Sequence, residues 1–140
     1  MAAFRDIAGR HIVMRPMPQT AAVLTGIVEP WSLFLGTNLL RCYWTREAAI
    51  ADANAAKDSI GQLRRMVLER SAELGEQISY AQREDRLDEA ASLCGSRWEL
   101  LRNFLLIRQA WNERLSQHDE LAPNVHAVLR EMQEAARAAF

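Results

Sequence analysis

The feature that most constrains this chain is a run of apolar residues spaced alternately four and three apart. The run comprises Ala49, Ala53, Ala56, Ile60, Leu63 and Val67. This spacing follows one face of an α-helix and is typical of helices that pack on other helices. Leu74, Ile78 and Ala81 continue it more weakly. The pattern predicts an amphipathic helix that begins after Thr45, whose hydroxyl can cap it, and reaches Arg83.

A second, heavier stripe follows a charged turn at residues 84–86. Its members share the same spacing and are Leu87, Ala91, Cys94, Trp98, Leu101, Leu105 and Leu115, with Phe104 and Trp111 beside them. A short turn makes two long helices antiparallel neighbours, which predicts a helical hairpin over residues 45–117. We expect the alanine face of residues Ala49–Ala56, which has small side chains, to pack against the bulky segment Phe104–Leu115. After Pro123, a third stripe predicts a shorter C-terminal helix over residues 124–139.

The predicted first helix is too long for a chain of 140 residues. Unbroken from Thr45 to Arg83, it would span ~58 Å, whereas a compact chain of this length has a radius of gyration near ~14 Å. Either this helix breaks near Gly75, or an arm protrudes and its apolar stripe needs a partner. The simplest partner is a second copy of the chain.

Residues 1–44 follow a different pattern, with short apolar runs in place of helical periodicity. The runs are His11–Met14, Ala21–Val28, Trp31–Leu35 and Leu39–Trp44. The Gly36-Thr37-Asn38 segment between the last two predicts a hairpin with a three-residue loop. We expect a small antiparallel sheet of three or four strands, although Ala21–Leu24 or Trp31–Arg41 could instead be helical. The predicted fold is therefore α+β and predominantly helical, in a single domain.

The sequence contains no established catalytic, metal or nucleotide motif. The carboxylates Glu84, Asp85, Asp88 and Glu89 fit a solvated turn and a helix start. His118, Asp119, Glu120 and His126 fit a solvated loop better than a metal site. Cys94 lies on an apolar stripe, where a free thiol packs as a small hydrophobic group. We expect no enzymatic activity, no metal and no cofactor.

The best candidate ligand site is a basic and aromatic group on the predicted sheet. It comprises Arg41, Tyr43, Trp44 and Arg46, with Arg15 nearby if the first run joins the sheet. Aromatic rings flanked by arginines can stack on bases, and residues 1–46 hold five arginines against two carboxylates. Packing of Trp44 under the helices is the competing interpretation. The net charge of −1 argues against nonspecific DNA binding.

The helical stripes favour a non-enzymatic protein–protein interaction module, such as an adaptor, an assembly subunit or a binding inhibitor or regulator. We expect a homodimer or larger homo-oligomer. The candidate interaction surface comprises Arg70, Leu74, Ile78, Arg108 and Trp111, because a charge on a stripe can set register or meet a partner's acid. A nucleotide- or nucleic-acid-binding module that uses the sheet is the alternative. Without a signal peptide or an apolar run of membrane-spanning length, the expected location is cytoplasmic.

Overall fold

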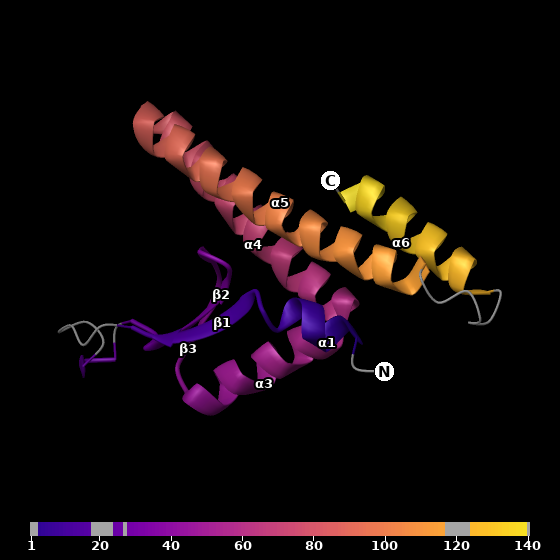
Figure 1. Cartoon of the computed structure of the whole chain (residues 1–140). Helices are drawn as coiled ribbons and strands as arrows, with labels where there is room; N and C mark the ends of the chain where they lie inside the picture. Colours follow the sequence, from indigo (N-terminus) through magenta and orange to yellow (C-terminus); the bar gives the residue numbers. More distant parts are fainter. Residues whose placement is uncertain (1–2, 18–23, 27, 117–123, 140) are drawn as a thin grey trace.

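A three-stranded antiparallel sheet forms the N-terminal part of the chain in the computed structural model (Figure 1). Its strands are β1 (Ile12–Pro16), β2 (Trp31–Leu35) and β3 (Asn38–Tyr43), paired in sequence order. The predicted small sheet is confirmed, and the helical alternative for Trp31–Arg41 is wrong. The structure describes residues 3–17, 24–26, 28–116 and 124–139, with α6 side chains described only over residues 130–138. Half of the run Ala21–Val28, residues 21–23 and 27, lies outside the described residues.

The β2–β3 hairpin has a two-residue loop in place of the predicted three, because Asn38 already pairs with Leu35. Gly36 opens the loop with a φ of 62°, a conformation that glycine adopts without steric cost. A register shift near Leu33 and Phe34 leaves Leu40 as an extra residue in β3. This bulge lets both Leu40 and Tyr43 enter the core, although strict alternation would place them on opposite faces.

A short helix that the sequence patterns did not predict precedes the sheet. Helix α1 (Ala3–Ala8) lies between α3 and α5 and buries Phe4 and Ala8. The Phe4 ring meets Trp111 of α5 edge to face, with ring centroids 5.5 Å apart. The apolar spacing of Phe4, Ile7 and Ala8 is helical, but six residues are too few for a periodic pattern to stand out.

The predicted first helix is two helices, α3 (Arg46–Asp58) and α4 (Ile60–Arg83). Thr45 caps α3 as expected, accepting a hydrogen bond from the Ala48 N–H at 3.2 Å. The helix is interrupted at Ser59, whose backbone is extended and whose Oγ accepts a hydrogen bond from the Gln62 N–H at 3.2 Å. The break expected near Gly75 is therefore misplaced, because a capping serine competes with the helix without disturbing the apolar spacing across it.

Because of this break, the alanine face of α3 packs against other elements than the sequence predicted. Ala49, Ala53 and Ala56 are buried among the sheet and α1, because α3 contacts all three strands and α1. The expected packing of this face on Phe104–Leu115 is wrong. Small side chains on α3 instead let its backbone approach the sheet closely.

The antiparallel hairpin of α4 and α5 (Leu87–Ser116) is confirmed (Figure 1). Its turn falls at residues 84–86, where the Arg86 N–H donates to the Ala81 carbonyl at 2.8 Å and Asp85 N–H to the Gln82 carbonyl at 3.1 Å. This pair of bonds is a Schellman motif. The last helix, α6 (Asn124–Ala139), has the predicted bounds and lies along the C-terminal half of α5.

Helix α5 turns a different face to α4 than its sequence suggested. The face it buries, fully or in part, comprises Ala90, Leu93, Arg97, Leu100, Phe104, Ile107 and Trp111. These residues are also spaced three and four apart. The helix therefore carries two apolar stripes about 110° apart, at ~100° per residue. The prediction that the stripe from Leu87 to Leu105 packs against the first helix is wrong, because periodicity alone cannot choose between two such stripes.

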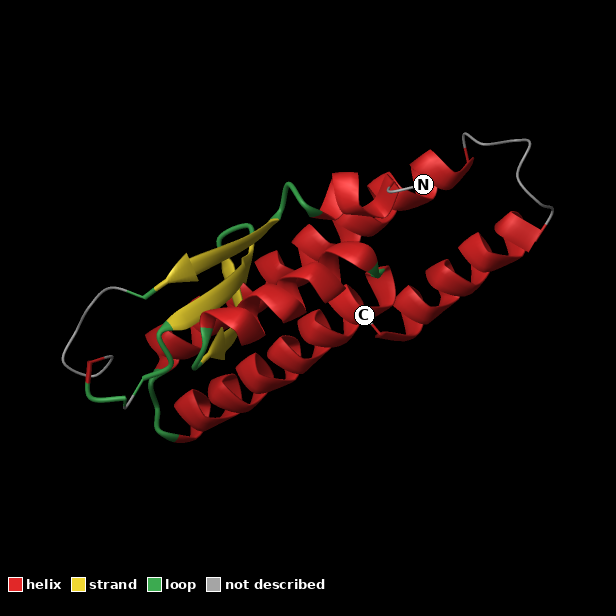
Figure 2. Ribbon diagram, turned by 90° about the horizontal axis from the view of Figure 1, so that it is seen from below, coloured by secondary structure: helices red, strands yellow, loops and turns green. Residues whose placement is uncertain are grey.

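The core gathers the inner face of the sheet and the facing sides of the helices. Leu33 and Leu35 of β2 join Leu63 and Val67 of α4 and Phe104 of α5 there. The strands lie at one end of the molecule and α6 at the other (Figure 2). Within the described residues, no helix combines the length and apolar content required to cross a membrane.

Candidate functional site

Arg41 and Tyr43, two residues of the candidate ligand site, lie in a polar cluster where β3 meets α3 and α4. The Tyr43 hydroxyl donates to Asp52 Oδ2 at 2.7 Å. One Arg41 nitrogen donates to the same oxygen at 3.0 Å, and another donates to Glu69. The bulged strand and two helices therefore bring one cation, one phenol and two carboxylates together.

Two groups of this cluster, Tyr43 and Arg41, have raised pKa values. Burial raises the pKa of Tyr43, and the hydrogen bond to Asp52 and its negative charge raise it further. Burial by itself would lower the pKa of Arg41, but the electrostatic effects of the Tyr43 phenol oxygen and of the Glu69 and Asp52 carboxylates outweigh it, so this pKa is raised. Tyr43 thus stays a neutral donor, and the charge of Arg41 is balanced within the chain.

The other members of the predicted ligand site do not join this cluster. Trp44 is 54% exposed, so it does not pack under the helices. Arg46 is the exposed first residue of α3. Arg15 lies over the Phe34 ring, 5.5 Å from its centroid. The patterns missed Asp52 and Glu69, since nothing in a helical carboxylate signals contact with a distant strand.

Four members of the predicted interaction surface lie within the chain's own packing. Leu74 and Ile78 are buried residues of α4. The Arg70 Nε donates to the Leu39 carbonyl at 3.2 Å, and its Nη1 pairs with Glu73 at 3.2 Å. Arg70 thus joins the end of the β2–β3 hairpin to α4. Trp111, half-buried against Phe4, ties α1 to α5.

Arg108, the remaining member, lies in a groove of about 550 Å³ between α5 and α6. The groove is lined by Leu105, Arg108, Gln109, Asn112, Glu113, Ser116, Gln133 and Arg137. The Arg108 Nε and Nη1 are buried and have no hydrogen-bond partner among the described residues. Burial lowers the pKa of Arg108, and the charge of Arg137 lowers it further. The C-terminal continuation of the α5 stripe that begins at Leu87 therefore meets α6 through a polar and poorly matched contact.

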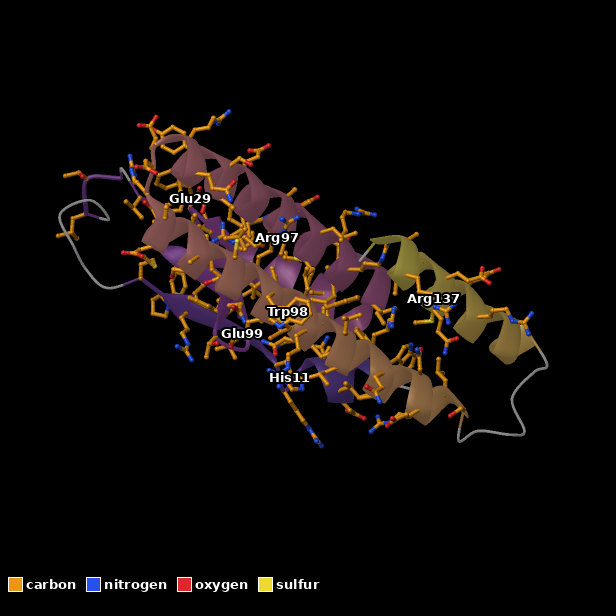
Figure 3. All side chains as sticks on the ribbon, turned by 90° about the horizontal axis from the view of Figure 1, so that it is seen from above. His11, Glu29, Arg97, Trp98, Glu99 and Arg137 are labelled. Carbon is orange, nitrogen blue, oxygen red and sulfur yellow. The ribbon has the colours of Figure 1, made fainter. Side chains whose placement is uncertain are left out.

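No described segment covers the N-terminal half of the same stripe in this way. Leu87 is 63% exposed and Trp98 is 72% exposed, and Ala91 and Cys94 between them are also exposed. We call Leu87, Ala91, Cys94, Trp98, Leu101 and Leu105 the outer stripe, whose last member, Leu105, also lines the groove beside α6. Figure 3 shows Trp98 on the outer side of α5, between Arg97, which bonds to Ser71 of α4, and Glu99, which accepts from Thr37 of the sheet. α6 lies beside the other half of α5 (Figure 1).

No group of three or more metal-binding side chains occurs within the described residues. His118, Asp119, Glu120 and the side chain of His126 lie outside them. Cys42 and Cys94 are both free thiols. The described residues thus present two features for function, the polar cluster at Arg41 and the outer stripe of α5.

The chain matches no protein-family model, and neither the curated proteins nor the solved structures contain a significant match to it.

Proposed function

We propose that the chain is a non-enzymatic protein–protein interaction module that associates with further copies of itself through the outer stripe of α5. The observation that carries this proposal is the exposure of Trp98 and Leu87 on a continuous apolar line. Burying one such side chain stabilises an assembly by about 2 kcal/mol. Clustered exposed apolar side chains mark interaction sites, whereas scattered ones are ordinary.

Two further observations support this proposal over binding of a nucleotide at the sheet. The charge of Arg41 and the hydroxyl of Tyr43 are already engaged by Asp52 and Glu69. Arg15 and Arg46 lie apart from that cluster. Binding at the sheet remains the alternative, and loss of oligonucleotide binding in Tyr43→Phe, where the fold is kept, would support it.

The proposal is tested by mass measured across a concentration series, using light scattering and sedimentation. The wild-type mass should rise above the 15.9 kDa of one chain as concentration increases. Trp98→Gln should remain a monomer with unchanged circular dichroism. Leu106→Gln is the matched control, because Leu106 is a 52% exposed residue of the same helix outside the outer stripe. A wild-type monomer at every concentration would refute self-association.

A further inference from the structure

The outer stripe of α5 is complementary to itself when two copies run antiparallel. Its spacing is symmetric about Ser96, so a two-fold axis there places Leu87 opposite Leu105 of the second copy. The same axis places Ala91 opposite Leu101 and Cys94 opposite Trp98. Each small side chain of the middle layers then meets a large one, which fills the space between two helices without voids.

Charges along one edge of the stripe agree with this alignment. Asp88 follows Leu87, and Arg102 follows Leu101, so both lie on the same flank of α5, two heptads apart. Both side chains are exposed, and neither makes an ion pair with another described residue. In the antiparallel pair, Asp88 of each copy lies beside Arg102 of the other. In a parallel pair, these two positions would stand ~21 Å apart along the axis, so Asp88 of one copy could not reach Arg102 of the other.

We propose that two copies of this chain associate through an antiparallel pairing of their α5 helices, centred on Ser96 and flanked by two Asp88–Arg102 ion pairs. This inference rests on the proposed function and names its partner and geometry. The paired segment, from Leu87 to Leu105, is only ~27 Å long. Such an interface is at the small end of specific interfaces, so the dimer should be reversible and dependent on concentration.

Charge reversal tests the pairing. Asp88→Arg and Arg102→Asp should each raise the dissociation constant about tenfold, because both ion pairs become repulsive. The double variant should recover wild-type affinity. An equimolar mixture of the two single variants should form a heterodimer, and these differences should shrink at 1 M salt. A double variant as weak as the single variants would overturn the proposal.

Crosslinking tests the direction of the helices. In a background with Ser at positions 42 and 94, Ala91→Cys and Leu101→Cys are treated with a short bismaleimide. The antiparallel pair should crosslink only when the two variants are mixed, because residue 91 of each copy lies ~15 Å along the axis from residue 91 of the other. A dimer of Ala91→Cys that crosslinks to itself would overturn the antiparallel pairing but leave self-association intact. Failure of the wild type to dimerise would overturn both.

Discussion

The guanidinium of Arg97 lies directly against Gly75, so that a Cβ at residue 75 would stand 3.3 Å from the Arg97 Nη1. Arg97 also donates from Nε to the buried Ser71 hydroxyl at 3.0 Å. Helix α4 runs through Gly75 without a break. The glycine therefore provides space for an arginine at the contact between α4 and α5.

This contact predicts coupling between positions 75 and 97. Gly75→Ala should change stability little, because a gain in helix propensity of about 1 kcal/mol is offset by displacement of Arg97. In the Arg97→Ala background, the same substitution should stabilise by the full ~1 kcal/mol. Urea denaturation of the four proteins measures this coupling as a double-mutant cycle. Additive effects on the free energy of unfolding would show that positions 75 and 97 are not coupled.

Tyr43→Phe should destabilise the fold by about 1 kcal/mol, because it removes the hydrogen bond to Asp52 inside the cluster. The pKa of Tyr43 is raised in the folded state, so its stabilisation is complete below the unfolded pKa near ~10 and declines as pH rises above it. Between pH 9 and 11, wild type should thus lose stability more steeply than Tyr43→Phe.

The matched control for that titration is Tyr80→Phe. Tyr80 is half-exposed and carries the other phenol of the chain. Removal of the Tyr80 hydroxyl should leave the steep decline of the unfolding free energy above pH 10 unchanged. Equal slopes for wild type and Tyr43→Phe would contradict the assignment to Tyr43.

Asp85 adopts a φ of 56°, the left-handed conformation that the Schellman turn requires. L-residues other than glycine adopt it at a cost of about 1 kcal/mol. Asp85→Gly should therefore stabilise the chain by roughly 0.5–1 kcal/mol, measured by thermal and urea unfolding. Glu84→Gly is the control and should destabilise, because Glu84 has a φ of −87°. A loss of stability in Asp85→Gly would indicate that the Asp85 carboxylate has a role of its own.

Arg108→Met should stabilise the chain by about 1 kcal/mol. The substitution removes buried guanidinium nitrogens that no described residue hydrogen-bonds, and it relieves repulsion from Arg137. Arg65→Met, at an exposed position of α4, should be nearly neutral. Both are compared by urea denaturation at low protein concentration, where self-association does not contribute. A destabilised Arg108→Met would mean that Arg108 holds α6 in place.

Local signals in the sequence were sufficient for the elements that depend on neighbouring residues. Thr45 marked the start of α3, residues 84–86 marked the hairpin turn, and Gly36 marked the turn of the sheet. The short C-terminal helix also has its predicted bounds. Each of these features depends on a side chain and backbone groups a few residues away, so the linear pattern was enough to predict it.

Other features depended on contacts that the linear pattern does not contain. Ser59 breaks the helix where α3 turns onto the sheet, and Asp52 and Glu69 meet Arg41 only because three elements converge. On α5, two stripes of equal periodicity compete. The sequence by itself determined that α5 carries apolar stripes on two of its sides. Only the tertiary structure decided which stripe is buried, because α4, α1 and the sheet together cover the stripe that contains Leu100 and Phe104. Helix α6 covers only the C-terminal half of the other stripe.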